Sequence, residues 1–372
     1  MSTTFSSLPI IDLAPLKNAS GLSEPDRITL SAKLYNVFAT TGFAYLVNTP
    51  LSFKHADVFG LALEFFNLPL EEKMKLAKKS FKPENENTYR GYFPVQPNAA
   101  SDNLKEGFEM GTRHPIQSTS TTDQTSRFNL TEPTVWPDST AYPSRSRLEQ
   151  LYSELQSLSS TILSLLATSL DKPADFFAPY LTDSLSTLRL LHYPPSPPIN
   201  DTTEIPFDKS STPPPEPTSP IKLSCAPHTD SGILTLLHQD STGGLEVQDS
   251  SGKWVAAPYV PESIVVNIGD LMAKVSGGRF VATMHRVRAP PPPPSPIAAG
   301  YQKGVVGVDG EDEDEEESTA KFGRFSVPFF FEPGEGCLVQ SVDVSGGDRG
   351  VIYGDHVRAK MESFVEYKRD QI

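Results

Sequence analysis

The amino-acid sequence predicts a mainly β fold with added helices, in which the C-terminal half forms a small antiparallel barrel or jelly roll. Short runs of branched and aliphatic residues alternate with glycine and aspartate turns, which is typical of strands in such folds. One apolar run ends at Gly269-Asp270, and another follows the Gly243-Gly244 turn. The predicted strands of this half are 233–238, 245–248, 263–268, 280–287 and 323–331.

Helices are predicted mainly in the first half of the chain, where apolar residues recur at helical spacing. The clearest case is 144–169, whose leucines would share one face of a helix. We expect these helices to buttress one face of the jelly roll. The chain therefore divides into a mixed α/β region at 1–180 and the jelly-roll core at 181–372. The predicted helices are 24–38, 53–66, 71–77 and 144–169.

Composition and charge favour a cytoplasmic protein and disfavour several classes of partner. The chain of 372 residues has a formal net charge of −14 and no basic cluster, which disfavours nucleic-acid binding. Its two cysteines, Cys225 and Cys337, provide no disulfide framework. Neither a signal-peptide pattern nor an apolar run of membrane-spanning length is visible. We expect a cytoplasmic monomer with a small-molecule partner, no nucleic acid and no membrane.

Two proline-rich stretches are predicted to be insertions in the jelly-roll core. The chain has 35 prolines, and many of them lie at 194–220 and 290–321. Consecutive prolines favour extended polyproline II and cannot join the interior of a sheet. The second stretch also contains an unbroken acidic run at 311–317, whose like charges repel one another. We interpret both stretches as surface loops; the alternative is a lid or a partner-binding arm.

His228, Asp230 and His285 together predict a metal site. Two imidazoles and one carboxylate are the ligand set that holds ferrous iron on one face and leaves the opposite positions open. His228 and Asp230 are two residues apart, so on a strand their side chains share one face. His285 lies in another predicted strand. The chain between His228 and His285 is long enough for this second strand to lie beside the first. The alternatives are an ion pair at a strand end and a buried core histidine.

Arg324 and Ser326 predict a carboxylate-binding position on a late strand. They are two residues apart at the start of the run 323–331, so they also share a face. The planar guanidinium group can donate two parallel hydrogen bonds to a carboxylate, and the neighbouring hydroxyl can add a third. The alternative is that Arg324 pairs with a carboxylate of the protein itself.

The chain resembles the iron- and 2-oxoglutarate-dependent dioxygenases, in the subgroup similar to isopenicillin N synthase. The resemblance covers most of the chain, and it depends on the order of several short motifs. Each motif is weak evidence when taken alone. The matching segments are 8–13, 42–48, 65–69, 71–73, 90–92, 105–108, 188–195, 267–270 and 285–287.

The resemblance implies a role for several residues near the predicted carboxylate site. Arg324 and Ser326 would bind the distal carboxylate of 2-oxoglutarate, and Tyr193 would form a hydrogen bond in the same site. Many relatives have an asparagine two positions before this tyrosine, where the present chain has Leu191. We therefore expect one cosubstrate contact to be missing or replaced.

Three aromatic residues are candidates for the substrate pocket. Tyr92 and Phe108 belong to the matching N-terminal segments, and Phe330 lies on the same predicted strand as Arg324. The alternative for all three is a place in the hydrophobic core, where large aromatic residues are often found.

The resemblance implies that His228, Asp230 and His285 bind Fe(II), with no catalytic residue beyond these ligands. The cosubstrates would be 2-oxoglutarate and dioxygen, and a small organic substrate would be hydroxylated, desaturated or cyclised, in specialised metabolism. One alternative is an iron oxidase of the isopenicillin N synthase type, which uses no 2-oxoglutarate. The other is a non-catalytic binding protein on the same scaffold.

Overall fold

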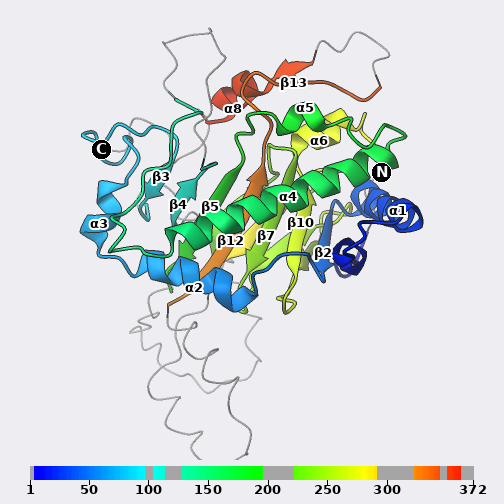
Figure 1. The fold of residues 1–372 in the computed structure, drawn as a ribbon. Helices are drawn as coiled ribbons and strands as arrows, with labels where there is room; N and C mark the ends of the chain where they lie inside the picture. Colours follow the sequence, from blue (N-terminus) through cyan, green and yellow to red (C-terminus); the bar gives the residue numbers. More distant parts are fainter. Residues whose placement is uncertain are drawn as a thin grey trace, which may run out of the picture.

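The fold is a sandwich of two β-sheets with helices covering the outer face of the larger sheet (Figure 1). This computed structural model describes residues 4–96, 104–113, 128–195, 222–290, 322–343 and 350–361. Of the two predicted insertions, 196–220 and 291–321 lie outside the described residues.

The larger sheet combines strands from both halves of the chain. Its first two strands run parallel, and its other neighbouring strands are antiparallel. In spatial order the strands are β1 (Ile10–Asp12), β2 (Phe43–Val47), β10 (Ile264–Ile268), β7 (Leu234–Gln239), β12 (Arg324–Phe331), β5 (Thr187–Tyr193), β4 (Glu106–Met110) and β3 (Gly91–Phe93). The regions 1–180 and 181–372 therefore share one sheet, and their division into domains stays a prediction.

The smaller sheet is antiparallel and carries both predicted metal-binding histidines. The predicted run 280–287 becomes a strand only from His285 onward, because the preceding residues contact the end of a helix. The Val281 N–H group donates to the Phe38 carbonyl, and the Thr283 hydroxyl donates to the Thr41 carbonyl. In order the strands are β6 (Leu223–His228), β11 (His285–Arg288), β8 (Leu245–Gln248) and β9 (Trp254–Ala256). A separate short ladder joins β13 (Leu338–Val339) and β14 (Val351–Ile352).

The predicted helices are confirmed, with small shifts at their ends. The longest, α4, lies across the outer face of the larger sheet and buries an apolar stripe against it (Figure 1). A short helix after β10 was not predicted. The helices are η1 (Ala14–Lys17), α1 (Glu24–Thr40), α2 (His55–Phe66), α3 (Leu70–Lys75), α4 (Arg145–Ser169), α5 (Ala178–Leu181), α6 (Asp270–Val275) and α8 (Tyr353–Met361).

Two hydrophobic clusters lie on opposite faces of the larger sheet. The bigger cluster fills the space beneath the helices and includes Phe325, Val327 and Phe329 of β12. The smaller cluster lies between the two sheets and includes Leu191 and Tyr193 of β5. Because side chains alternate along a strand, the even-numbered residues of β12 face the space between the sheets. We call this the inner face of the larger sheet.

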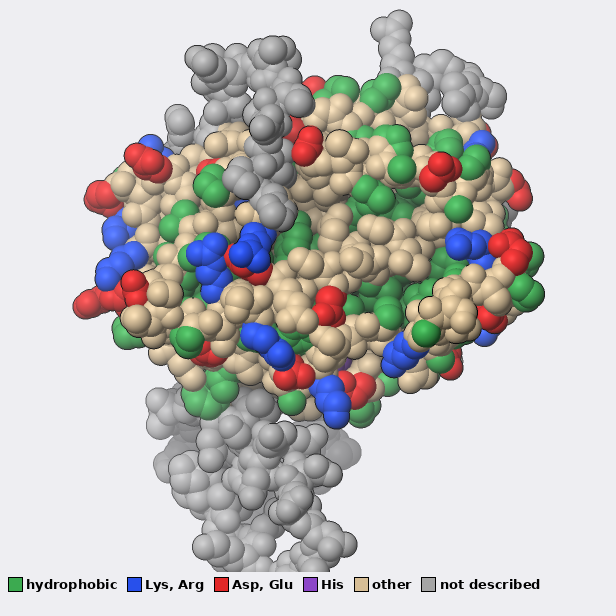
Figure 2. Space-filling view, in the orientation of Figure 1, with side chains coloured by type: hydrophobic (Ala, Val, Ile, Leu, Met, Phe, Trp, Pro, Cys, Tyr) green, Lys and Arg blue, Asp and Glu red, His purple; other side chains and the backbone are tan. Residues whose placement is uncertain are grey.

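The predicted fold class, a jelly-roll core buttressed by helices, is confirmed, although the two sheets do not close into a barrel. On the face shown in Figure 2, acidic and basic side chains of the described residues are interspersed. Among the helices of the described ranges, none is long and apolar enough to cross a membrane.

Candidate metal centre and cosubstrate site

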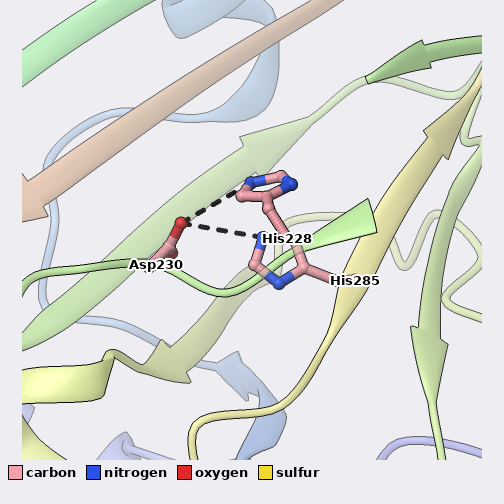
Figure 3. Close-up of side chains that lie close together, drawn as sticks. All are labelled: His228, Asp230 and His285. Atoms are coloured by element: carbon pink, nitrogen blue, oxygen red, sulfur yellow. Dashed lines mark ion pairs between the residues drawn. The ribbon is translucent and has the colours of Figure 1, made fainter. Parts of the chain in front are cut away.

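The side chains of His228, Asp230 and His285 converge on one point between the sheets (Figure 3). His228 is the last residue of β6 and His285 is the first of β11, and the antiparallel register pairs them directly. Asp230 follows two residues after β6. Its Oδ1 lies 3.8 Å from Nε2 of His228 and 3.7 Å from Nε2 of His285. The possible ligand atoms all lie within 4.8 Å of one another, which suits one shared metal ion.

Backbone carbonyl groups hold both imidazole rings in a defined orientation. Nδ1 of His228 lies 2.8 Å from the Ala226 carbonyl oxygen, and Nδ1 of His285 lies 3.1 Å from that of Thr283. A neutral imidazole that donates from Nδ1 has its lone pair on Nε2, the atom that faces Asp230. Burial lowers the pKa of His285, which favours the neutral form that a metal requires.

The second carboxylate oxygen of Asp230 is held by two hydrogen bonds. The Thr235 hydroxyl donates to Oδ2 over 2.6 Å, and the Asn267 side-chain amide donates over 2.8 Å. Burial by itself would raise the pKa of Asp230, but the two imidazoles and these hydrogen bonds outweigh it and lower the pKa. The aspartate is therefore ionised and oriented, as a metal ligand should be.

The junction between β10 and α6 positions the Asp230 backbone. The Asp270 N–H group donates to the Asp230 carbonyl oxygen over 2.7 Å. This contact requires a glycine at position 269, because a Cβ there would lie 2.3 Å from the Gly232 carbonyl oxygen. The Asn267–Asp270 motif thus supports the metal centre through one side chain and one backbone contact.

Arg324, Ser326 and Tyr193 lie together at an enclosed position on the inner face. The register pairs Arg324 with Tyr193, and the guanidinium carbon lies 4.7 Å above the tyrosine ring. Arg324 is 1% exposed, and its Nε donates to the Gly243 carbonyl oxygen over 2.6 Å. Its Nη1 is buried without a hydrogen-bond partner among the described residues. A buried cationic donor with no partner is costly, which suits a bound carboxylate.

The predicted substrate residues separate into two groups. Tyr92 and Phe108 belong to the cluster beneath the helices, where Phe108 stacks on Phe65 with ring centroids 4.4 Å apart. Their positions favour a core role. Phe330 shares the inner face with Arg324, and the register pairs it with Thr235. Only Phe330 of the three therefore lies close to the metal centre.

Sequence reasoning missed the residues that support the site. Thr235 lies in a predicted strand, but a threonine at an inward position carries no distinctive signal. Asn267 was part of a recognised motif without a role assigned to it. Its side chain contacts Asp230 only because β10 and β7 are neighbours in the folded sheet.

Two family models match the chain. The model of the 2OG-Fe(II) oxygenase superfamily matches residues 186–333, and that of the non-haem dioxygenase N-terminal region, named for morphine synthesis, matches residues 8–139. A 2-oxoglutarate-dependent dioxygenase of Monascus ruber, citB, is 30% identical over 75% of this chain and 79% of its own length. The chain belongs to the 2-oxoglutarate- and Fe(II)-dependent oxygenases. Fe(II), 2-oxoglutarate and dioxygen are accordingly its metal and cosubstrates.

Other relatives within this oxygenase family are named for different activities. Clavatol oxidase claD of Penicillium crustosum is 32% identical over 75% of this chain and 80% of its own. Proline hydroxylase buaE of Petromyces alliaceus is 31% identical over 78% of this chain and 80% of its own. The chain is thus an oxidoreductase of a small organic substrate, related to enzymes with unlike substrates.

Solved structures confirm the fold of this oxygenase. A full-length Neurospora crassa protein in complex with alpha-KG and thymine superposes with a TM-score of 0.68, at 22% identity, over 95% of this chain and 96% of that chain. The rice dioxygenase for auxin oxidation superposes with a TM-score of 0.58, at 21% identity, over 96% of this chain and 95% of that chain.

Proposed function

We propose that His228, Asp230 and His285 hold the Fe(II) of this dioxygenase. The observation that carries the proposal is the convergence of two Nε2 atoms and one carboxylate oxygen from separate segments. When bound, Fe(II) and 2-oxoglutarate together activate dioxygen for oxidation of a substrate C–H bond, and the cosubstrate leaves as succinate and carbon dioxide. The three side chains supply a fixed facial ligand set and leave the remaining positions to cosubstrate and dioxygen.

We further propose that Arg324 and Ser326 bind the distal carboxylate of 2-oxoglutarate, with Tyr193 beside them. Support comes from the shared inner face, the enclosure of all three residues and the buried Nη1 of Arg324. In this enclosed position a charge-assisted hydrogen bond is stronger than in water. The cosubstrate is thereby prevented from rotating on the metal.

The test is oxygen consumption by the purified full-length chain, with Fe(II), in the presence and absence of 2-oxoglutarate. We expect consumption to require 2-oxoglutarate and to yield succinate, and we expect His228→Ala to lose both. Consumption without 2-oxoglutarate would favour an oxidase of the isopenicillin N synthase type. A protein that binds no Fe(II) would favour a binding module.

We propose that the substrate is a small organic molecule. The relatives named for proline and for clavatol suggest a small organic molecule, and hydroxylation, desaturation or ring closure remain the possible outcomes. Phe330 is proposed to form part of the pocket wall. Screening candidate substrates for stimulated succinate formation tests this class.

We also propose a cytoplasmic monomer that uses neither nucleic acid nor membrane as a partner. The net charge of −14 supports the absence of nucleic acid. Cys225 and Cys337 form no disulfide, which fits a reducing compartment. Sedimentation of the purified chain tests the monomer, and a dimer at micromolar concentration would contradict it.

A further inference from the structure

We propose that a doubly protonated His192 holds the start of β12 in place and thereby positions Arg324 for 2-oxoglutarate. His192 is a positioning residue, because it acts through the strand and not by contact with the cosubstrate. The inference deepens the proposed function and rests on it, since it requires Arg324 to bind the distal carboxylate.

The His192 ring joins β4 to the residues that lead into β12. His192 lies on β5, where the register pairs it with Glu106 on one side and with Phe325 on the other. Its Nδ1 lies 2.7 Å from Oε1 of Glu106, and its Nε2 lies 2.6 Å from the Phe322 carbonyl oxygen. Both ring nitrogens therefore lie at hydrogen-bonding distance from an oxygen atom.

Each of these two contacts requires an N–H group on the ring. A backbone carbonyl oxygen can only accept a hydrogen bond, and so can an ionised carboxylate. Burial alone would raise the pKa of Glu106, but hydrogen bonds from His192, Tyr92 and Lys73 outweigh it and lower the pKa. A neutral imidazole has a single N–H group, so one of its nitrogens would direct a lone pair at an oxygen. The two short contacts therefore fit the imidazolium form.

The surroundings fix the orientation of the ring. The side chains of His192 and Glu106 are 14% and 10% exposed. The Phe325 ring stacks on the imidazole, with centroids 4.8 Å apart and an angle of 16° between the planes. The other charged or titratable groups of this network reach the ring through the carboxylate: the Lys73 ammonium group donates to Oε2 of Glu106 over 2.9 Å, and the Tyr92 hydroxyl donates over 2.6 Å.

Arg324 is the residue that the start of β12 has to position. It is the first residue of the strand, and the ends of elements open more readily than their middles. On the β7 side, the Phe325 N–H group donates to the Asp240 carboxylate. On the β5 side, His192 holds the Phe322 carbonyl, two residues before Arg324. Loss of this contact would loosen the backbone that carries the guanidinium group, and a bidentate hydrogen bond depends on its geometry.

The binding of 2-oxoglutarate should therefore depend on the proton that His192 carries. A neutral ring donates to one acceptor, and the charged Glu106 is the stronger of the two, so the Phe322 contact is lost. Since the protonated ring accompanies tight binding, the affinity for 2-oxoglutarate should fall as the pH rises through the titration of His192. By linkage, bound 2-oxoglutarate should in turn favour the protonated ring.

The test measures 2-oxoglutarate binding by titration calorimetry, on the full-length chain with Zn(II) in place of Fe(II). His192→Phe keeps an aromatic ring for the stack and removes both donors. At about pH 6, where an ordinary histidine is protonated, we expect this variant to bind 2-oxoglutarate about 5-fold more weakly or worse. The affinities of the two chains should converge toward pH 9, and their affinities for Zn(II) should agree within twofold.

The protonation of the ring can be observed directly by NMR of the chain labelled with ¹⁵N-histidine. The signals of His192 are assigned by their absence in His192→Phe and in His192→Gln. We expect protons on both nitrogens at low pH, and loss of one over the pH range in which the affinity for 2-oxoglutarate falls. A ring that stays neutral, or one that titrates in a different range, would overturn the inference.

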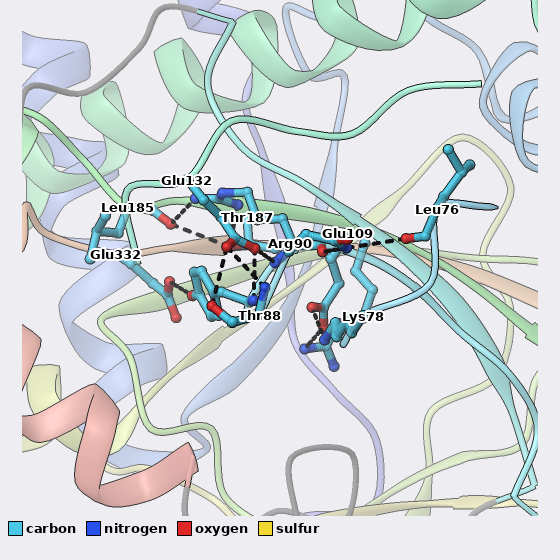
Figure 4. A network of polar contacts seen from close by, with 12 residues as sticks. Leu76, Lys78, Thr88, Arg90, Glu109, Glu132, Leu185, Thr187 and Glu332 are labelled. Atoms are coloured by element: carbon cyan, nitrogen blue, oxygen red, sulfur yellow. Dashed lines mark hydrogen bonds and ion pairs between the residues drawn. The ribbon is translucent and has the colours of Figure 1, made fainter. Parts of the chain in front are cut away.

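Two control variants separate this role from general stability. Tyr92→Phe removes another hydrogen bond to Glu106, and Thr187→Val removes the acceptor of Arg90 at the opposite end of β5 (Figure 4). Both should keep the dissociation constant of 2-oxoglutarate within twofold, together with its pH dependence. An equal loss in either control would assign His192 a structural role, and an unchanged affinity in His192→Phe would also overturn the inference. A wild-type chain that binds no 2-oxoglutarate would instead contradict the proposed function.

Discussion

At the scale of single residues, the site is controlled by which atom of each side chain is left free. Asp230 directs one carboxylate oxygen toward the two imidazoles because its other oxygen is held by Thr235 and Asn267. Arg324 donates a hydrogen bond from Nε to a backbone carbonyl oxygen. Its Nη1 is buried and has no hydrogen-bond partner within the described ranges. In both cases the protein's own hydrogen bonds decide what remains for a ligand.

Removing the amide that holds Asp230 should weaken metal binding. We expect Asn267→Ala to raise the dissociation constant for Fe(II) by about 10-fold or more, since a ligand that loses its supporting hydrogen bond loses its orientation. Anaerobic titration calorimetry measures this. Asn48→Ala, which removes an exposed amide bonded to Asp12, is the control and should have no effect.

Replacing the guanidinium group of Arg324 should weaken the binding of 2-oxoglutarate and leave the binding of Fe(II) unchanged. We expect Arg324→Met to raise KM for 2-oxoglutarate by about 10-fold to 100-fold, the loss expected for a hydrogen bond to a charged group. Arg324→Lys should recover only part of the affinity, because an ammonium group cannot form the fork. An unchanged KM in both variants would show that the carboxylate of 2-oxoglutarate binds elsewhere.

At the scale of elements, close approach between segments sets the metal centre. The end of β10 touches the segment that carries Asp230, and Gly269 permits this contact. The antiparallel register of β6 and β11 brings the two histidines side by side. Neither contact is local in the sequence, so each depends on how the strands are ordered.

A side chain at position 269 should destabilise the fold near the site. Gly269→Ala places a Cβ against the Gly232 backbone, and we expect the free energy of unfolding to fall by about 1–3 kcal/mol. Urea unfolding measures this change. Gly60→Ala in α2 is the matched control: nothing lies within 4 Å of its Cβ, so stability should rise by about 0.5–1 kcal/mol.

At the scale of the whole molecule, the larger sheet separates a helix-covered core from the reaction space. Apolar side chains fill the outer face, and charged residues lie between the two sheets. Titratable groups are nevertheless buried on the outer side as well, and His238 is one of them. His238 pairs with Val327 in the sheet, is 2% exposed, and its Nδ1 has no partner among the described residues.

This histidine should make the fold sensitive to acid. Burial lowers the pKa of His238 to about 3, so below pH 6.5 the unfolded chain binds a proton that the folded chain does not. Stability is therefore present above pH 6.5 and lost as the pH falls toward 3. Between pH 7 and pH 5 the contribution is a loss of about 2 kcal/mol. We expect His238→Phe to flatten the pH dependence of urea unfolding by that amount; an unchanged slope would contradict this.

The sequence alone predicted the fold class, the longer helices and several core strands, because alternating and helical apolar patterns report directly on which face is buried. The order of its short motifs predicted the family. The sequence also singled out the histidines, Asp230 and Arg324, since these residue types in that spacing suit one chemistry. Only the tertiary structure decided the rest. Tyr92 and Phe330 look alike as aromatic candidates for the substrate pocket, yet they lie on opposite faces of one sheet. Arg189 has neighbours from three other segments, and which segments meet there depends on strand order, which local patterns do not specify.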